Sequence, residues 1–435
     1  MPRKTTWSLL LVLLFLMLGL GAAPGDAAPV YVLLTTIPVP PSADNVQGGA
    51  FTGYDIAFFD GTTQLMYLAD RSNASVDIFS AKTNSFVGRV GGTGNLFVGI
   101  QPRPVNPATV NNDISGPDGV VVANFGGAKQ LWAGDGPSLL KGFDLTVPGS
   151  PPLGGTPINT GAVPATRVDE MAFDPRDHLL LVANNAADPP FATLVDTQTR
   201  AIVTKIIFNG ANADGHNAPN ATNGIEQAVW DPSHGGRFFI SIPQLNGGGP
   251  GGVAMIDPLT GNVTKVYDFA TLSGGAVTAC SPAGLALGTG GKLMVGCGVA
   301  SQSILLDPNA NGGNGSIKTF PQVSGEDMVW FDPTTNRYFL AARLNPGGPV
   351  LGIIDGLTET FLQNVRTTPG DHSVAVDPVS GEVFVPFGGS FGTAVNSICP
   401  LGCIGVFGVP EPGSLLLLGV GLIGVGGLSL RRRLR

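Results

Sequence analysis

Charged residues are scarce in this sequence. Lys and Arg number 23 and Asp and Glu number 31 in 435 residues. So few basic residues exclude a nucleic-acid-binding surface, which needs a clustered excess of Lys and Arg. Six of the basic and two of the acidic residues lie within residues 1–27 and 409–435, so the stretch between them carries a net charge of −12. A region with that negative net charge favours cations as ionic partners.

Motifs for phosphate, zinc and thiol redox chemistry are also missing. The sequence has no phosphate-cradling glycine loop, no His-Glu-x-x-His motif, no zinc-ligand spacing and no Cys-x-x-Cys pair. Its four cysteines suit an oxidising compartment. We expect Cys280 to pair with Cys297 across the turn of a predicted hairpin, and Cys399 with Cys403 in a small loop. Four cysteines allow three pairings, so this one is a hypothesis.

Glycine and proline are abundant instead, with 64 and 36 residues. Together with many Asn and Thr residues, they are typical of a turn-rich all-β protein rather than a helical one. The content of Val, Leu, Ile and Phe is sufficient for a large core, which argues against disorder.

A repeated pattern organises the chain. Residues 328–331 form a short apolar run, an Asp-Pro turn follows at 332–333, and a second apolar run occupies residues 338–342. This pattern predicts two strands joined by a tight turn. Seven copies recur at intervals of roughly 45 to 60 residues, the period of propeller blades. The sequence therefore predicts an all-β fold, a seven-bladed β-propeller over residues 28–408.

The repeats resemble the YVTN and NHL types of β-propeller repeat. Residues 67–73 (Tyr-Leu-Ala-Asp-Arg-Ser-Asn), 181–185 and 257–261 carry the resemblance, which supports the fold and implies no particular activity. Residues 30–37 are predicted to form a lone strand that completes the last blade and removes an exposed edge.

Four long insertions rich in Gly, Pro and Asn interrupt the repeats. They lack apolar periodicity, so we expect loops at the blade edges. A rigid scaffold with variable loops is a common binding design, and specificity would lie here. The insertions are residues 91–116, 148–165, 209–223 and 387–403.

Acidic residues recur at one position of the repeat, five residues before the turn Asp. The seven copies have Asp55, Asp118, Asp169, Glu226, Ala283, Asp327 and His372 there. In a propeller these residues begin the innermost strands and surround one mouth of the central channel. Such a ring could hold Ca²⁺ or another divalent metal, which prefers several oxygen ligands. The same acids are also compatible with a solvated polar mouth that holds no ligand.

This arrangement resembles that of propeller lactonases and streptogramin-type lyases. The resemblance implies that the five acids supply metal ligands and that His372 is the base. Three functions therefore stay open. The first is a propeller that binds a ligand, glycan or protein, and the second is a metal-dependent hydrolase or lyase that acts at the channel mouth. The third is a structural surface protein with no specific ligand.

Both ends of the chain differ from the repeats. Arg3 and Lys4, the apolar run 7–20 and the small residues after it predict a secretory signal peptide over residues 1–27. At the other end, the apolar segment 414–430 is long enough, at about 25 Å of helix, to cross a thin bilayer. This predicts a transmembrane helix with the terminal arginines in the cytoplasm and the propeller outside.

The C-terminal region, residues 409–435, closely resembles the PEP-CTERM sorting signal of Gram-negative envelopes. Its parts are a Pro-Glu-Pro motif, an apolar segment and an arginine-rich tail. The residues are Pro410, Glu411, Pro412, Arg431, Arg432, Arg433 and Arg435. A plain C-terminal anchor is the alternative and would have the same topology.

This resemblance implies where the protein works and what handles it. It implies an exosortase that removes the tail, and exopolysaccharide or envelope proteins as further partners. It also implies anchoring at the outer side of the inner membrane, followed after processing by a location at the cell surface or in the extracellular matrix, either released or attached.

Overall fold

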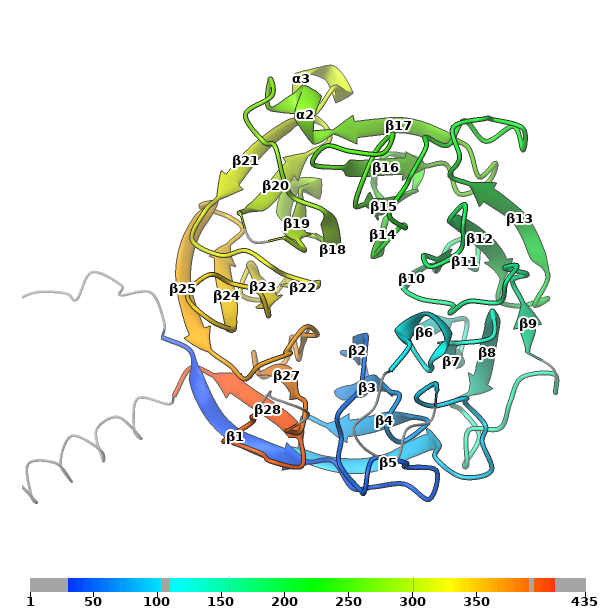
Figure 1. Ribbon diagram of the computed structural model, residues 1–435, viewed down its shortest axis with the longest axis vertical. Coiled ribbons are helices and arrows are strands. Elements are labelled where there is room, and N and C mark those ends of the chain that lie inside the picture. The colour runs from blue at the N-terminus through cyan, green and yellow to red at the C-terminus, as the bar shows by residue number, and fades with distance from the viewer. Residues whose placement is uncertain (1–29, 103–109, 156, 300, 391–394, 411–435) are drawn as a thin grey trace, which may run out of the picture. The chain divides into compact units, whose positions relative to one another are not determined.

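Seven four-stranded antiparallel sheets surround a central axis in the part of the chain that the computed structural model describes. That part comprises residues 30–102, 110–155, 157–299, 301–390 and 395–410. Figure 1 shows β2, β6, β10, β14, β18 and β22 nearest the centre, with β5, β13, β17, β21, β25 and β1 at the rim. The predicted seven-bladed β-propeller is confirmed.

Six sheets follow the chain order from the innermost strand outwards. The first three contain β2 (Ala57–Asp60), β3 (Leu65–Asp70), β4 (Ser75–Ser80) and β5 (Ser85–Gly91); β6 (Val120–Phe125), β7 (Ala128–Asp135), β8 (Leu139–Asp144) and β9 (Ile158–Asn159); and β10 (Met171–Asp174), β11 (Leu179–Asn184), β12 (Phe191–Asp196) and β13 (Ile202–Ile207).

The next three sheets repeat this order. They contain β14 (Ala228–Asp231), β15 (Arg237–Ile242), β16 (Gly252–Ile256) and β17 (Val263–Asp268); β18 (Pro282–Leu287), β19 (Leu293–Cys297), β20 (Ser303–Asp307) and β21 (Ser316–Phe320); and β22 (Met328–Asp332), β23 (Arg337–Ala342), β24 (Val350–Asp355) and β25 (Thr360–Arg366). Short helical turns lie in the connections, namely η1 (Asn112–Ile114), η2 (Ser233–Gly235), η3 (Thr289–Gly291), α2 (Phe269–Leu272) and α3 (Ala310–Gly313).

The seventh sheet joins the two ends of the propeller. Its strands are β26 (Ala375–Val376), β27 (Val383–Phe387), β28 (Cys403–Gly408) and β1 (Val32–Pro38), and β1 pairs antiparallel with β28. The predicted closing strand is therefore confirmed, shifted slightly from residues 30–37. Gln363 of the neighbouring blade exchanges two 3.0 Å hydrogen bonds with the backbone of Tyr31, which holds the start of β1 in place.

Aspartates at the end of the first strand explain the recurring Asp-Pro and Asp-Gly turns. Asp60 Oδ1 accepts the N–H of Thr62 at 3.0 Å, and Asp332 Oδ1 accepts the N–H of Thr334 at 2.9 Å. The same bond recurs at Asp174, Asp231 and Asp377. A side chain that bonds the backbone two residues later fixes a tight turn, so the repeat is a turn signal as much as a strand signal.

The predicted signal peptide (residues 1–27) and the predicted membrane segment (414–430) lie outside the described residues. Glu411, Pro412, Arg431, Arg432, Arg433 and Arg435 lie outside them too. Among the residues that the structure does describe, no helix has the length and apolar character needed to cross a bilayer.

Both predicted disulfides are present. Cys280 is bonded to Cys297 and Cys399 to Cys403, and the structure has no free cysteine. The first bond ties the end of β19 to the segment before β18. The carbonyl of Cys297 also accepts the N–H groups of Gly325 and Glu326, so this disulfide supports the segment that leads into the innermost strand of the sixth blade.

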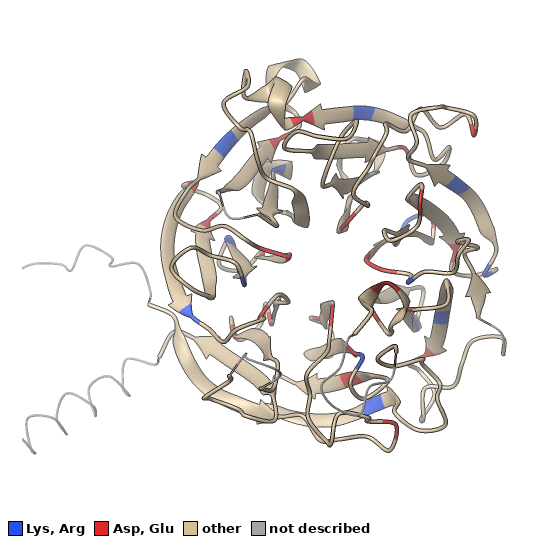
Figure 2. Cartoon of the chain, in the orientation of Figure 1, with Lys and Arg blue, Asp and Glu red and all other residues tan. Residues whose placement is uncertain are grey.

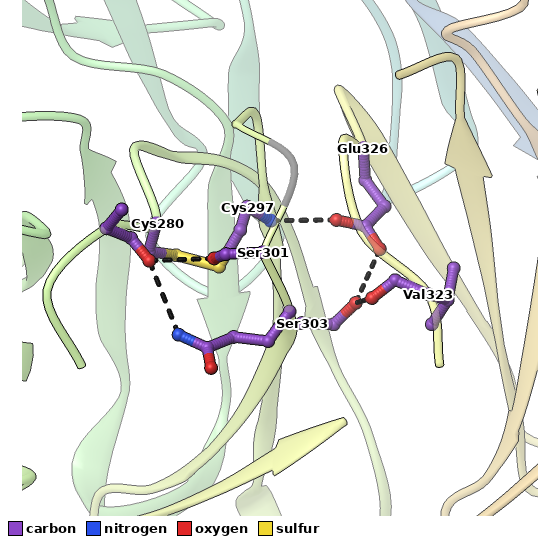
Figure 3. The surroundings of a disulfide bond; sticks show 8 residues. Cys280, Cys297, Ser301, Ser303, Val323 and Glu326 are labelled. Atoms are coloured by element: carbon purple, nitrogen blue, oxygen red, sulfur yellow. Dashed lines mark hydrogen bonds between the residues drawn. A yellow bond between two sulfur atoms is a disulfide. The ribbon is translucent and has the colours of Figure 1, made fainter. Parts of the chain in front are cut away.

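Glu326 is a fully buried acid beside that disulfide (Figure 3). Its Oε2 accepts the N–H of Cys297 at 3.0 Å, and its Oε1 lies 2.5 Å from the hydroxyl of Ser303. That hydroxyl also lies 2.8 Å from the carbonyl oxygen of Val323. One hydroxyl cannot donate to both acceptors, so a proton on Glu326 that is donated to Ser303 satisfies all three groups. Burial accordingly raises the pKa of Glu326 to about 8.

The closing strand supplies one prediction. Ile37 is 1% exposed and packs in the core with Phe384 and Ile404, whereas Leu34 in the same strand is 42% exposed. Ile37→Ala should lower the free energy of unfolding by about 2–4 kcal/mol because it leaves a cavity. Leu34→Ala should lower it by about 1 kcal/mol or less. Denaturant unfolding measures both, and equal losses would show that β1 does not pack as described.

Glu326 supplies a second prediction. The folded protein keeps the proton on Glu326 up to about pH 8, whereas the unfolded chain loses it near pH 4.5. The free energy of unfolding should therefore fall as pH rises between these values, by about 1.4 kcal/mol per pH unit from this group.

Glu326→Gln should remove that contribution, because an amide can replace the protonated acid without ionising. The difference in unfolding free energy between the variant and the original protein should grow from pH 5 to pH 8. Asp113→Asn, at a side chain that is 63% exposed, serves as the control. Identical pH profiles for the Glu326→Gln variant and the original protein would contradict a proton on Glu326.

Candidate functional site

One pocket opens where the first strands of the blades begin, and we call it the mouth pocket. It has a volume of about 440 Å³. Five of the six ionisable residues of the predicted ring line it, namely Asp55, Asp169, Glu226, Asp327 and His372. Figure 2 shows acidic residues on several of the segments around the central axis. The fold therefore brings together residues from five blades that are far apart in the sequence.

Asp118, the sixth ionisable member of the ring, does not line the mouth pocket. Its side chain is fully buried and accepts a hydrogen bond from Arg71 Nε at 2.5 Å. Arg71 also forms an ion pair with Asp55 and donates to the carbonyl of Tyr54 at 3.2 Å. One guanidinium thus lies between acids of the first and second blades. Ala283, at the equivalent position of the fifth copy, lies within β18 and does not line the pocket.

Three arginines line the mouth pocket, and the sequence analysis missed them: Arg71, Arg167 and Arg343. Arg167 Nε donates to Asp169 Oδ2 at 2.6 Å, and Arg343 Nη2 lies 2.9 Å from Asp327 Oδ2. The pocket therefore presents fixed pairs of hydrogen-bond donors and acceptors, not a ring of acids alone.

Hairpin pairing explains where two of these arginines lie. The N–H of Asp55 donates to the carbonyl of Ala69 at the end of the second strand, and Arg71 follows two residues later. In the sixth blade the N–H of Asp327 likewise bonds the carbonyl of Ala341, and Arg343 follows two residues later. In the third blade Asp169 bonds Ala183, and Asn185 follows two residues later. A comparison of the seven copies at this second position would have found both arginines.

Burial and charge act on these acids in opposite directions. Burial raises the pKa of Asp55, but the Arg71 guanidinium, His372 and Arg167 together outweigh it and hold that pKa well below its usual range. Burial raises the pKa of Asp118 above its usual range, although the same guanidinium opposes it. The pKa of Asp169 is raised to about 6, again by burial and against the effect of Arg167. Burial and the charges of Asp169 and Asp327 raise the pKa of Glu226.

Glu170 is a further acid at the mouth pocket that the sequence analysis missed. Asp169 and Glu170 precede β10, so the strict alternation of strand side chains does not apply, and both line the pocket. Burial and the charges of Asp169 and Glu226 raise the pKa of Glu170 well above its usual range. Among the described residues, ligand atoms of Asp169, Glu170 and Glu226 all lie within 4.8 Å of one another, so these three residues could hold a metal.

His372 is held by backbone carbonyls. Its Nδ1 lies 2.6 Å from the carbonyl oxygen of Gly370, and its Nε2 lies 3.2 Å from that of Tyr54. The ring also stacks on Tyr54, with centroids 4.5 Å apart. Both nitrogens thus face protein acceptors, although a neutral imidazole can donate to only one of them, and Nε2 also lies 3.7 Å from Asp55 Oδ1.

A second cavity, of about 540 Å³, is lined by later residues of the same innermost strands. Its walls are mainly apolar and include Phe58, Phe173, Trp230 and Trp330. Glu170 lines both cavities and marks the boundary between them. Ionic chemistry is therefore concentrated at the end of the channel where the mouth pocket lies.

Two of the four predicted loop insertions contribute to the mouth pocket. Ile100, Val110 and Asn112 belong to the insertion at 91–116, and Gly388 and Gly389 to that at 387–403. Described residues of the insertions at 148–165 and 209–223 do not line it. The walls therefore combine rigid strand ends with loop residues from the first and last blades.

Comparison with solved structures shows the fold alone, because the sequence identities are low. Hydrazine synthase of Kuenenia stuttgartiensis is similar with a TM-score of 0.55 and 13% identity, over 79% of this chain and 95% of that one. The WD40 repeats of RRP9 are similar with a TM-score of 0.55 and 10% identity, over 86% and 99%. The β-propeller domain of Myceliophteria thermophila Cps50 (Swd1) gives 0.54 and 11%, over 88% and 100%.

The C-terminal region gives a match of a different kind. No curated protein matches the sequence, but residues 408–433 match the model of the PEP-CTERM protein-sorting motif. Residues 411–433 of this match lie outside the described residues. The motif implies export, membrane anchoring before processing, and an exosortase as the processing partner. This chain is therefore a seven-bladed β-propeller that carries a PEP-CTERM sorting motif directly after its last strand.

Proposed function

We propose that the protein is a surface or extracellular-matrix protein whose mouth pocket binds a hydroxyl-rich ligand such as a glycan. In this proposal residues 1–27 direct export, the segment 414–430 spans the inner membrane before processing, and an exosortase removes the tail. The propeller is then displayed at the cell surface or in the matrix, where exopolysaccharide is the expected ligand.

The pairing of arginines with carboxylates in the mouth pocket is the observation that carries the proposal. Arg343 is 38% exposed and Asp327 is 28% exposed, so this pair offers a donor and an acceptor to a ligand that enters from solvent. Neighbouring hydroxyl groups both donate and accept, and they match such a pair. Binding sites combine a rigid concave surface with a few fixed polar groups, and this pocket has that form.

A metal-dependent hydrolase or lyase at the same pocket is supported less well. Such an enzyme needs a general base with a free lone pair within reach of the substrate. His372 is the residue predicted for that role, but both of its ring nitrogens face the carbonyl oxygens of Gly370 and Tyr54. The geometry therefore supports binding better than proton abstraction.

The ligand proposal predicts the effect of one arginine. Arg343→Gln should weaken binding of purified exopolysaccharide from the producing cells about tenfold or more, because hydrogen bonds to charged groups contribute about 1.5–3 kcal/mol. Isothermal titration calorimetry measures the affinity, and a glycan array identifies shorter ligands. Arg366→Gln, an exposed position at the end of β25 in the same blade, is the matched control and should bind normally. Equal affinity in all three proteins would place binding elsewhere.

The sorting proposal predicts the fate of the C-terminus. Mass spectrometry of protein released from the producing cells should find chains that end near Pro410 and lack the arginine-rich tail. Replacing Pro410, Glu411 and Pro412 by alanine should leave the full-length chain in the membrane fraction. Leu401→Ala, in an exposed loop of the propeller, should be processed normally. Mature protein that still ends at Arg435 would contradict processing.

A further inference from the structure

We infer that Asp169, Glu170 and Glu226 form a binding site for one divalent cation, and that Ca²⁺ is the ion this site fits. We call these three residues the carboxylate cluster. The inference rests on the proposed function, because it assigns a class of ligand to part of the same mouth pocket.

The spacing of the carboxylate cluster suits Ca²⁺. One ligand atom from each residue lies within 4.8 Å of the other two. Two ligands of one ion can be at most twice the metal–oxygen distance apart, which is about 4.6–5.2 Å for Ca²⁺ and only about 4.0–4.2 Å for Mg²⁺. Each pair of these oxygens is thus within the reach of one Ca²⁺ ion, whose flexible coordination leaves room for water and ligand oxygens.

Two buried oxygen atoms of the cluster have no partner. Asp169 is 2% exposed and Glu170 is 6% exposed, yet Asp169 Oδ1 and Glu170 Oε2 accept no hydrogen bond from any described residue. A buried polar atom that has lost its hydration without gaining a partner is destabilising, and native structures usually satisfy it. Both atoms belong to residues that line the mouth pocket, where a cation would supply the missing partner.

Neighbouring basic groups do not neutralise the cluster. Arg167 donates to Asp169 Oδ2 and to Asn185 Oδ1, which leaves Asp169 Oδ1 unbonded. Arg71 is bonded to Asp55 and Asp118, and Arg343 pairs with Asp327. When a cation displaces their protons, the three carboxylates and the Arg167 guanidinium together carry a net charge of −2, which one divalent cation balances.

The backbone around the cluster is held close to the second blade. A Cβ atom at Gly119 would overlap the carbonyl oxygen of Asp169, and one at Gly134 would overlap that of Val168. On the other side, Asn185 Nδ2 lies 3.4 Å from Glu226 Oε1 and orients that carboxylate. These contacts fix ligands from two blades before an ion arrives, as a preorganised site requires.

Cation titration of the full-length protein, after dialysis against a chelator, tests the inference. Calorimetry should show one Ca²⁺ bound per chain, with a dissociation constant of about 10⁻⁴–10⁻³ M, as in other extracellular modules, and weaker binding of Mg²⁺. Ca²⁺ should also raise the melting temperature. Absence of Ca²⁺ binding, or tighter binding of Mg²⁺, would overturn the inference.

Two isosteric variants locate the ion. Glu170→Gln should lower the Ca²⁺ affinity at least tenfold and abolish the rise in melting temperature, while circular dichroism confirms that the variant is folded. Asp188→Asn changes an exposed acid of the same blade that does not line the mouth pocket, and it should keep the Ca²⁺ affinity within about twofold. If the control variant lowered the Ca²⁺ affinity and Glu170→Gln did not, or if both variants lowered it equally, the cluster would be ruled out as the site.

The same titrations separate this inference from the proposed function. If exopolysaccharide binds and depends on Arg343 but Ca²⁺ does not bind, the cation site is wrong and the ligand proposal stands. If Ca²⁺ binds and depends on Glu170 but no polysaccharide binds, the cation site stands and the ligand proposal fails.

Discussion

The hydrogen bonding of β1 to β28 is the constraint on which the rest of the structure depends. It supplies the outer strand of the seventh blade from the start of the chain and leaves no open edge between the first and last blades. Closure brings Asp55 of the first blade to 3.7 Å from His372 of the seventh, and Ser373 accepts the N–H of Ala57 at 2.9 Å. This side of the mouth pocket forms where the first and seventh blades come into contact.

Charge balance defines what the mouth pocket can do. Each arginine of the pocket forms an ion pair with particular acids, and Arg71 pairs with both Asp55 and Asp118. Such pairs are rigid, because breaking a buried ion pair leaves an uncompensated charge. The exposed pair at Arg343 and Asp327 faces solvent, whereas Asp169 and Glu170 of the carboxylate cluster are buried and have unbonded oxygen atoms. The pocket thus has one region suited to a polar ligand and another suited to a cation.

Much of the fold could be predicted from the sequence because one physical signal repeats. The Asp turn after the first strand recurs in a regular pattern. The Cys280–Cys297 disulfide follows from the position of one hairpin, and the closing strand follows from the lone strand before the first repeat. Strand bounds differ by a residue or two because the acids precede the innermost strands instead of beginning them: Asp169 lies two residues before β10.

The candidate site could be predicted only in part. The sequence position of the acids identified five lining residues because all the first strands begin at one end of the channel. Arg71 and Arg343 directly follow the partner strands of the hairpins, and their place beside the acids depends on the pairing register, which the position of the acids alone does not reveal. The burial of Asp118 depends on a guanidinium from the preceding blade. Glu170 was missed because the next position along the repeat is acidic in this copy alone, with Ile56, Gly119 and Gln227 among its equivalents.

Hydrogen–deuterium exchange of the segment 32–38 tests the central claim of ring closure most directly. Backbone amides that bond β28 should exchange as slowly as those of β28 itself, because both strands open only when the ring opens. Exchange of this segment at the rate of an unpaired peptide, while β28 stays protected, would contradict closure and with it the geometry of the mouth pocket.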